Sequence, residues 1–541
     1  MTRHAAPDSL DAHTRTRALE RLAEERYDVI VIGGGVTGAG VALDAASRGL
    51  RTALIEQVDL AAGTSRWSSK LAHGGLRYLA TGNVGVAWES AMERHHLMTR
   101  IAPHLTRSTT YLVPLDANTG AAMGALTTAG VHVADAMRIA ARTPAITLPR
   151  PRRINAAQVL HLAPGVRQQH LRGAVSYTDG QIEDDARLVI ALARTASAHG
   201  ADIITRCRAS ELTADSATLH DDLTGQSLTV HGHIISATGV WAGNHTPDLT
   251  ILPSRGSHLI VHADAVGRPH AVFTAPVPGH FGRFVFAVPQ TDDIVLIGLT
   301  DEEAPGVDGI APPVPAAEED FLIDTINRAL ERPLTHADIL GRFAGLRPLV
   351  IPTTNTDDAD QHSNHKPTSD VSRRHLLLDT PGAPITIAGG KLTTYRKMAQ
   401  DAVDAVAKRI PNGSTVGGHT ISPCRTTTLP LIGAAPHDVL AQIDAPTRLI
   451  RRYGTQATDV MALAQQHPEF ATPVLPPTNG HQTPPMATIG AELLYGALHE
   501  GALTVDDLIE RRTRLSFIED GRAQATEVAE RALALAADLQ H

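Results

Sequence analysis

Five short segments of this chain carry clustered basic or imidazole side chains, four of them beside glycine or proline. The side chains are Lys70, His73, Arg77 and Tyr78 in the first segment, Arg255 and His258 in the second, Arg347 in the third, Arg373 and Arg374 in the fourth, and Lys391 and Arg396 in the fifth. Two or three guanidiniums beside a lysine suit a phosphate dianion, because bidentate charge-assisted bonds both attract and orient it. An imidazole suits general-base chemistry near neutral pH. If these segments converge, they form a site for an anionic substrate; for any single arginine, a solvated surface charge is the simpler interpretation.

The chain uses arginine as its ordinary cation. Lysine and arginine total 48, yet only five of these are lysine: Lys70, Lys366, Lys391, Lys397 and Lys408. Lys70 and Lys391 lie inside glycine-rich motifs, where a compact point charge has a use that a guanidinium lacks. This placement favours a functional role for both.

The elements expected to position these side chains begin with a nucleotide-binding unit. It has, in order, an apolar strand at 29–32, Gly33, Gly35 and Gly38 in the G-x-G-x-x-G spacing, a helical stretch near 41–46, a second apolar strand at 52–55, and Glu56. Glycines let the backbone approach a pyrophosphate at a helix N-terminus, and a carboxylate after the second strand accepts ribose hydroxyl groups. This order of elements predicts a bound dinucleotide.

That unit alone fits either FAD or NAD, whereas Glu56 argues against NADP, whose extra phosphate prefers an arginine there. Two further segments favour FAD. Residues 233–242 are typical of a strand running into a small-residue turn, and residues 384–391 of a strand and glycine turn that opens a helix at 395–410. The N-terminus of that helix can stabilise negative charge on a reduced isoalloxazine ring. A tight strand-to-helix turn is the simpler interpretation of each segment.

The pattern of elements divides the chain into an interrupted nucleotide fold and two further parts. We expect a flexible tail at 1–26; an FAD-binding domain from 27–80, 175–245 and 340–410; a substrate domain with an antiparallel sheet from 81–174 and 246–339; and a helical domain at 425–541. Residues 84–110 are expected to be helical. Asp184 and Asp185 are expected to cap the helix that follows them. The predicted fold class is α/β (α+β).

Composition excludes several classes of protein. A net charge of −9 and a pI near 6.3 argue against a nucleic-acid partner. Two cysteines, Cys207 and Cys424, predict no disulfide framework and a reducing compartment. The first 26 residues lack the apolar core of a secretory signal, and no apolar run approaches the roughly 18 residues of a membrane span. We therefore expect a protein of the cytoplasm or of a membrane surface, without a metal ion.

Two long motifs resemble one enzyme family. Gly63 to Leu79 contains G-T-S-x-x-S-S-K-L-x-H-G-G-L-R-Y-L, and Gly389 to Arg396 contains G-G-K-L-T-T-Y-R, as in the FAD-dependent, quinone-linked glycerol-3-phosphate dehydrogenases. Shorter similar segments end at His258, Asp301, Pro348 and Leu515. The resemblance covers roughly residues 27–410 and, more loosely, residues 430–520.

The resemblance implies a D-amino-acid-oxidase-like fold that binds FAD non-covalently and carries a C-terminal helical cap. It implies oxidation of sn-glycerol 3-phosphate to dihydroxyacetone phosphate, with hydride passing from C2 to flavin N5 and electrons passing to a membrane quinone. We therefore expect a cytoplasmic enzyme held peripherally on the inner face of the cell membrane. The helical segments near 86–107 and 136–153 are candidates for the attachment, although ordinary surface helices are the simpler interpretation of them. A homodimer is one expected assembly.

The same resemblance implies roles for individual residues. His258, Lys391 and Arg77 are expected to be catalytic, and the substrate is expected to contact Arg77, Tyr78, His258, Arg347, Arg373 and Lys391, with Arg374 as the alternative to Arg373. Contacts with FAD are expected from Gly33, Gly35, Gly38, Glu56, Thr64, Ser65, Ser69, Lys70, His73, Gly74, Ala237, Thr238, Gly239, Gly390, Lys391, Leu392 and Thr393. Two positions depart from the family pattern: Trp67 stands where a small residue is common, and Leu299 where threonine is more usual.

Three alternatives share part of this pattern. A glycerol-3-phosphate oxidase that uses oxygen would share every motif. Another D-amino-acid-oxidase-like enzyme, acting on a hydroxy acid or an amino acid, would not need several arginines for a dianion. A non-catalytic flavin-binding protein is the third alternative, and no substrate would bleach its flavin.

Overall fold

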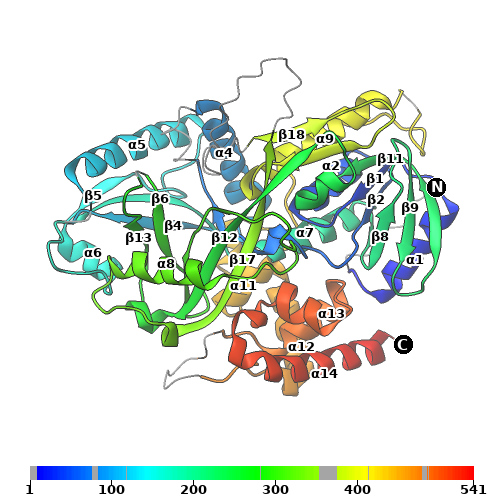
Figure 1. Cartoon of the computed structure of the whole chain (residues 1–541). Helices are drawn as coiled ribbons and strands as arrows, with labels where there is room; N and C mark the ends of the chain where they lie inside the picture. The colour runs from blue at the N-terminus through cyan, green and yellow to red at the C-terminus, as the bar shows by residue number, and fades with distance from the viewer. Residues whose placement is uncertain are drawn as a thin grey trace, which may run out of the picture.

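The computed structural model describes residues 9–75, 83–116, 119–280, 282–351, 374–411, 414–477, 484 and 486–540. Arg77, Tyr78 and Arg373 lie outside the described residues. Figure 1 shows two lobes, each built on a sheet, with a helical part below them. The two long strands β12 (Thr250–His262) and β17 (Ile339–Ile351) run side by side through the middle of the molecule.

The first lobe is built on a six-stranded sheet. Its strand order is β18 (His375–Leu378), β19 (Ile385–Gly389), β11 (His233–Ser236), β1 (Val29–Ile32), β2 (Thr52–Ile55) and β7 (Asp202–Ile204). The strands from β19 to β7 are parallel, and β18 is antiparallel to β19. Every residue of β1 and β2 is buried, as their unbroken apolar sequences predicted for strands covered on both faces.

Different layers cover the two faces of this sheet. Helices α2 (Val36–Ser47), α7 (Asp185–Ala198) and α9 (Tyr395–Arg409) pack on one face; the three-stranded sheet of β8 (Cys207–Ser210), β9 (Ser216–Asp221) and β10 (Ser227–His231), together with α1 (Ala12–Glu24), packs on the other. The helix pairs α2–α9 and α2–α7 are in direct contact. This arrangement is typical of a dinucleotide-binding fold.

The prediction of a flexible tail at 1–26 is wrong for residues 12–24, which form α1. Asp11 caps this helix, and Ala18 and Leu22 are buried against the first lobe. Arg15 forms a buried ion pair with Asp221. Because only a narrow stripe of this charged segment is apolar, its sequence did not distinguish a packed helix from a solvated tail.

The second lobe is built on a ten-stranded, mostly antiparallel sheet. Its order is β16 (Glu302–Glu303), β12, β15 (Ile294–Gly298), β14 (Phe284–Pro289), β13 (Val272–Pro276), β4 (Thr106–Pro114), β6 (Ala174–Ile182) and β3 (Leu71–Ala72), with β17 beside β12 and β5 (Arg152–Ile154) beside β6. β4 and β13 are the parallel pair. Helix α8 (Ala316–Asn327) packs against the sheet on one face, and α5 (Ala121–Ala140) lies near β4 and β6 (Figure 1).

Two expectations about element boundaries need correction. The predicted FAD-binding segments 175–245 and 340–410 begin with β6 and β17. Both strands instead belong to the ten-stranded sheet of the second lobe. Residues 84–110 are helical only over α4 (Val84–His96) and a π-helical segment at Leu97–Ile101, and then the chain enters β4. β4 was missed because its pairing partners β6 and β13 lie sixty or more positions away, and such pairing overrides local propensity.

The C-terminal region is helical, as predicted. It contains α10 (His437–Leu440), α11 (Thr447–Tyr453), α12 (Ala457–Gln466), α13 (Gly490–His499), a π-helical segment at Asp507–Arg512, and α14 (Arg522–Gln540). Ala525, Ala529, Ala532 and Ala536 form the buried stripe of α14, at the spacing of one helix face. Across the described ranges, we find no helix with both the length and the apolar composition to cross a bilayer.

Candidate functional site

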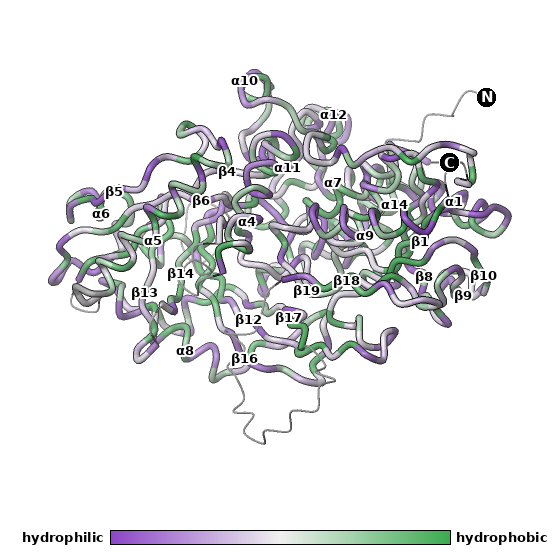
Figure 2. Tube along the Cα trace, turned by 90° about the horizontal axis from the view of Figure 1, so that it is seen from above, coloured by the Kyte–Doolittle hydropathy of each residue, from purple (hydrophilic) through white to green (hydrophobic). Residues whose placement is uncertain are grey.

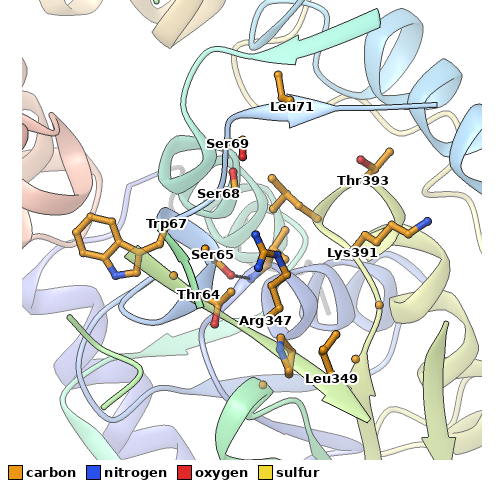
Figure 3. Close-up of a pocket in the computed structure, with 18 of the residues that line it drawn as sticks. Thr64, Ser65, Trp67, Ser68, Ser69, Leu71, Arg347, Leu349, Lys391 and Thr393 are labelled. Atoms are coloured by element: carbon orange, nitrogen blue, oxygen red, sulfur yellow. Dashed lines mark hydrogen bonds between the residues drawn. The ribbon is translucent and has the colours of Figure 1, made fainter. Parts of the chain in front are cut away.

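A cavity of about 910 Å³ lies where the two lobes meet. Its walls include the carboxyl ends of β1, β2, β11 and β19 from the first lobe, and β12, β14 and β17 from the second. Figure 3 shows Thr64, Ser65, Arg347 and Lys391 around this pocket. Dinucleotides bind at the carboxyl ends of strands in open α/β sheets, so the first-lobe wall is placed for one.

The turn from β1 into α2 has the geometry that a pyrophosphate requires. Gly33 has φ of +111°, and a β-carbon there would lie 2.6 Å from the carbonyl oxygen of Ala237. A β-carbon at Gly38 would lie 1.8 Å from the carbonyl oxygen of Gly33, so the helix packs directly on the turn. Gly35 is the N-cap of α2 and lines the cavity, where the helix amides and dipole favour an anion.

Glu56 lies at the end of β2, as predicted, and lines the cavity. Its Oε2 accepts a hydrogen bond from the Gly34 amide at 2.7 Å, and its Oε1 accepts one from the Val58 amide at 2.7 Å. Burial raises the pKa of this carboxyl above its usual range, while the two amide bonds oppose that rise. Each oxygen keeps a lone pair with which to accept a ribose hydroxyl.

The segment from Thr64 to Ser69 crosses the cavity between the lobes. Thr64 Oγ1 donates to the Leu346 carbonyl at 2.7 Å, and Ser65 Oγ accepts from the Val36 amide at 2.9 Å. These bonds connect the segment to β17 on one side and to the start of α2 on the other. Thr64, Ser65 and Ser69 all line the cavity, and their contacts with FAD stay a prediction.

Two further backbone turns complete the first-lobe wall. Ala237, Thr238 and Gly239 follow β11, and Gly390, Lys391, Leu392 and Thr393 follow β19; all seven line the cavity. Gly389 and Gly390 both have φ of +75°. This turn leads through a short 3₁₀ segment into α9, whose N-terminus therefore lies close to the cavity wall.

His258 lines the cavity from β12 and is 2% exposed. Its neighbours across the strands are Gly298 of β15 and Phe343 of β17. A β-carbon at Gly298 would lie 2.3 Å from the imidazole, so the ring leans over this glycine. The Nε2 atom is 2.9 Å from Ser69 Oγ. Burial, aided by the charges of Lys70 and Arg347, lowers the pKa of His258 to about 3, which leaves the imidazole neutral.

An aromatic stack connects His258 to the C-terminal region. The imidazole stacks on Phe343 with centroids 4.6 Å apart, and Phe343 stacks on Phe517 at 5.0 Å. Trp67 stacks on Phe343 at 5.6 Å. Such pairs contribute about 0.5–1.5 kcal/mol each beyond burial. The unusual Trp67 therefore packs beside the histidine and its supporting rings.

Arg347 and Lys391 enter the same cavity from different elements (Figure 3). Arg347 Nη1 lies 3.4 Å from Asp301 Oδ1, and its Nη2 donates to the Thr300 carbonyl at 3.2 Å. A β-carbon at Gly256 would lie 2.2 Å from the guanidinium, so the glycine two positions before His258 leaves space for it. Lys391 Nζ donates to Ser90 Oγ of α4 at 2.9 Å.

The structure does not bring every predicted residue to the cavity. Gly38, Lys70 and Gly74 do not line it, whereas His73 does. Lys70 is fully buried, and its Nζ donates to the Arg66 carbonyl at 2.6 Å and to Asp185 Oδ2 at 2.9 Å. The Gly74 amide donates to the Asp179 carboxylate at 3.1 Å. Gly38, Lys70 and Gly74 thus pack behind the residues that line the cavity.

Other basic residues singled out by the sequence also serve as structural ion-pair partners. Arg396 forms a buried pair with Glu93, and Arg255 with Glu318. Asp184 caps α7 as predicted, while Asp185 accepts hydrogen bonds from Ser68 and Lys70. The capping prediction thus accounts for only one of the two carboxylates.

One end of the cavity was not foreseen. It lies between α5 and the strands β4, β6 and β14, and we call it the α5 arm; its lining includes Tyr111, Tyr177, Phe284, Met123, Thr127 and Val133. These residues come from four elements spread over more than 150 positions. No local motif marks them, and only the apolar face of the segment at 121–140 could have indicated a buried surface there.

Family models match nearly the whole chain. The model for FAD dependent oxidoreductases matches residues 28–396, and that for the C-terminal domain of alpha-glycerophosphate oxidase matches residues 424–540. Glycerol-3-phosphate dehydrogenase 1 of Mycobacterium tuberculosis is 45% identical over 526 residues, covering 96% of this chain and 98% of the relative. The chain belongs to the FAD-dependent glycerol-3-phosphate dehydrogenase family. Aerobic glycerol-3-phosphate dehydrogenase of Staphylococcus aureus is 29% identical over 537 residues, or 93% of this chain and 90% of the relative.

Solved structures agree on the fold of this glycerol-3-phosphate dehydrogenase family member. The glycerol-3-phosphate dehydrogenase of Bacillus halodurans complexed with FAD aligns with a TM-score of 0.68 at 24% identity, covering 98% of this chain and 97% of that one. The L-alpha-glycerophosphate oxidase of Mycoplasma pneumoniae with FAD bound aligns at 0.55 and 18% identity, covering 75% and 99%. The predicted D-amino-acid-oxidase-like fold with a C-terminal helical domain is confirmed.

The cofactor of the family is FAD, and the residues present fit it. The cavity includes Glu56, Gly35 at the start of α2, and the glycine turn before α9, which suits an elongated dinucleotide. Gly33 and Gly390 let these turns pack closely on neighbouring segments, since a side chain there would collide with Ala237 and Met398, respectively. Fourteen of the seventeen predicted FAD contacts line the cavity, and the three exceptions lie behind its wall.

Proposed function

We propose that this chain oxidises sn-glycerol 3-phosphate to dihydroxyacetone phosphate and passes the electrons to a membrane quinone. One observation carries the substrate assignment. Gly256 and Gly298 leave space for the Arg347 guanidinium and the His258 imidazole, respectively, so a cation and a neutral base share one cavity with the FAD-binding turns. A small phosphorylated alcohol needs this combination.

Arg347 is the proposed phosphate ligand. Its contacts to Asp301 and Thr300, at 3.2–3.4 Å, are longer than the 2.7–2.9 Å usual for a charge-assisted bond. A dianion would therefore make shorter bonds to the guanidinium than these two groups do. Lys391 would add a second positive charge from the facing turn, and Arg77, Tyr78 and Arg373 complete the proposed set from outside the described residues.

His258 is the proposed base that accepts the proton of the C2 hydroxyl. Its imidazole is neutral, and Nε2 is held near the hydroxyl of Ser69, which can orient the ring or hand on the proton. When bound, FAD supplies the hydride acceptor, its N5 atom. Lys391 and the nearby N-terminus of α9 would stabilise the negative charge that the hydride acceptor gains.

His258→Gln tests the base assignment. We expect kcat to fall about 10²–10⁴-fold, the usual contribution of a general base, with a smaller change in KM. Flavin content and the thermal midpoint should stay near those of the parent protein, which would exclude unfolding as the cause. A variant that kept kcat and lost only substrate affinity would refute the role.

A substrate panel separates this proposal from its rivals. The holoprotein should turn over sn-glycerol 3-phosphate with a quinone analogue, and should not act on glycerol, a hydroxy acid or an amino acid. Rapid hydrogen peroxide production in air, without any added acceptor, would instead indicate the oxygen-using oxidase. Turnover of an amino acid at a comparable kcat/KM would refute the phosphate assignment.

The proposed membrane surface lies on α4, α5 and the loop after α5. Large hydrophobic side chains are exposed there: Val84, Trp88, Leu126, Val133, Ile139 and Ile146, with Ile146 91% exposed. Exposed arginines follow at 142, 150, 152 and 153. Apolar side chains beside basic ones suit the interface of an anionic bilayer. Figure 2 shows α5 at the same end as β5, β13 and β14, away from β8–β10, with α4 nearer the middle of the molecule.

Liposome flotation tests this surface. The holoprotein should float with vesicles containing phosphatidylglycerol and bind less to vesicles of phosphatidylcholine alone. Val133→Glu together with Ile139→Glu should abolish flotation, whereas Leu223→Glu, a matched change at an exposed residue of the β9–β10 turn, should not. Equal flotation of the two variants would refute the assignment of this surface.

A further inference from the structure

The α5 arm offers contacts that neither FAD nor the phosphorylated substrate needs. Its walls are mostly aromatic and aliphatic: Tyr111 from β4, Tyr177 from β6, Phe284 from β14, and Met123, Thr127 and Val133 from α5. Tyr111 and Tyr177 stack with ring centroids 5.0 Å apart. Both FAD and glycerol 3-phosphate carry charged phosphates that match the glycine turn and Arg347 instead. The arm therefore suits a third, more apolar molecule.

The hydroxyl group of Tyr111 identifies one functional group of that molecule. Tyr111 is 3% exposed, lines the cavity, and its hydroxyl has no hydrogen-bond partner within the described part of the chain. Burial, assisted by the nearby charge of Asp179, raises the pKa of Tyr111 well above its usual value, so the group stays protonated. An unsatisfied buried donor is unfavourable, and a ligand carbonyl that accepts from it removes that cost.

The carboxylate of Asp179, which lies near this hydroxyl, already has partners. Asp179 is engaged by Arg94 at 2.5 Å and by the Gly74 amide. Arg283 borders the cavity from the turn before β14. Thr274, also in the lining, donates to the Leu112 carbonyl at 3.3 Å. The Tyr111 hydroxyl is thus the buried donor with no partner of its own among these described lining residues.

The arm also reaches the surface at the proposed membrane face. Leu126 and Val133 line the cavity and are 47% and 50% exposed. Val84 of α4, 57% exposed, lines it as well. An apolar ligand that leaves a bilayer at α4 and α5 would therefore meet the open end of the arm directly.

We propose that the α5 arm binds the quinone electron acceptor, an inference that rests on the proposed function. The planar ring packs against Tyr111, Tyr177 and Phe284, and one ring carbonyl accepts a hydrogen bond from Tyr111. The tail passes Leu126 and Val133 toward the bilayer. Oxidation of the alcohol to the ketone releases two electrons and two protons, and the quinone takes up the same number to leave as the quinol.

The test separates this site from the substrate site. Holoprotein is reduced anaerobically with dithionite, mixed with decylubiquinone or with hydrophilic ferricyanide, and followed by the return of flavin absorbance. Thr127→Trp fills the arm, Tyr111→Phe removes the donor, and Ala136→Trp is the matched control on an exposed position of α5 that does not line the cavity. Equilibrium dialysis of menadione with each oxidised protein gives binding without turnover.

We expect Thr127→Trp to slow reoxidation by decylubiquinone at least about tenfold. Tyr111→Phe should weaken menadione binding about fivefold to tenfold, the effect of one hydrogen bond. Neither variant should change reoxidation by ferricyanide or bleaching by sn-glycerol 3-phosphate, and Ala136→Trp should match the parent protein.

Two results would overturn the inference. One is parental reoxidation by decylubiquinone in both arm variants. The other is loss of bleaching by sn-glycerol 3-phosphate in Thr127→Trp with quinone reoxidation intact, which would make the arm part of the substrate site. If substrate does not bleach the flavin of the parent protein, only the proposed function is refuted. The quinone reaction can still be measured after reduction with dithionite.

Discussion

Arginines serve two regions of this molecule in different ways. At the interface with the C-terminal helices they are buried in tight, multiple bonds: Arg512 Nη1 and Nη2 contact Asp59 at 2.6 and 2.9 Å, and Arg511 Nε contacts the same carboxylate at 2.6 Å. In the cavity, Arg347 is 21% exposed and held at 3.2–3.4 Å. An abundance of arginine therefore does not identify an anion site. An arginine whose side chain lines a cavity is the better indicator of such a site.

For Arg347, which lies in the cavity, this comparison predicts a large effect on substrate binding and none on stability. Arg347→Gln should lower kcat/KM for sn-glycerol 3-phosphate about 10²–10³-fold, because a desolvated charge-assisted contact to a phosphate contributes several kcal/mol. The urea midpoint should stay close to the parent value. Arg347→Lys should recover part of the loss, since it restores charge without the bidentate fork. Equal kcat/KM values for the Gln variant and the parent would remove Arg347 from the site.

For Arg511 and Arg512, at the interface with the C-terminal helices, the comparison predicts that removing their shared carboxylate lowers stability without changing substrate affinity. Asp59→Asn leaves Arg511 and Arg512 without their shared counter-charge, and breaking such a buried group costs about 3–5 kcal/mol. Urea unfolding of the holoprotein should show that loss, while KM of the folded enzyme stays within about twofold. Asp538→Asn, on an exposed position of α14, is the control and should change neither quantity. A raised KM with an unchanged urea midpoint would erase the distinction between the two regions.

The aromatic stack links the two regions and predicts a moderate effect on pH dependence. Because burial holds the pKa of His258 near 3, the acid limb of kcat/KM should lie below the usual histidine value of about 6.5. Phe343→Leu loosens the packing around the imidazole, so the limb should move toward pH 6.5 and kcat should fall severalfold. Phe470→Leu, a buried change outside the stack, should leave the profile in place. If the acid limb of kcat/KM stayed in place in Phe343→Leu, Phe343 would not control the pKa of the His258 imidazole.

Acid should destabilise both regions, by a smaller amount for each pH unit. His104 and His258 are buried and neutral, with the pKa of each lowered to about 3 by burial. Below pH 6.5 the unfolded chain therefore binds more protons than the folded one, so stability falls as pH falls. Each histidine should lower the free energy of unfolding by up to about 1.4 kcal/mol per pH unit between 6.5 and 3. His104→Gln should flatten the dependence of the urea midpoint on pH, and an unchanged slope would contradict this account.

The nucleotide end of the site could be predicted because its signal is local. The strand, glycine turn, helix and acid from Val29 to Glu56 lie within one stretch of chain, and each has its own physical requirement. The turn before α9 is local in the same sense. Of the FAD contacts predicted in these two stretches, Gly38 does not line the cavity, whereas the others do: Gly33, Gly35, Glu56, Gly390, Lys391, Leu392 and Thr393.

The side chain of Lys70 and the lining of the α5 arm are placed by contacts with distant parts of the chain. Lys70 was predicted to contact FAD, yet Asp185, 115 positions away, draws its ammonium away from the cavity. Tyr111 reaches the arm only because β4 pairs with β6 and β13. Nothing in the sequence near these residues distinguishes a ligand contact from a structural ion pair, since the same side-chain types serve both.

The most direct test of the central claim is a single anaerobic turnover in a stopped-flow instrument. Holoprotein mixed with excess sn-glycerol 3-phosphate should lose its oxidised flavin absorbance completely, and glycerol at the same concentration should cause no change. That result would establish the cofactor and the substrate together. Bound flavin that stays oxidised with sn-glycerol 3-phosphate, in a protein that dithionite reduces normally, would contradict the account while leaving the fold intact.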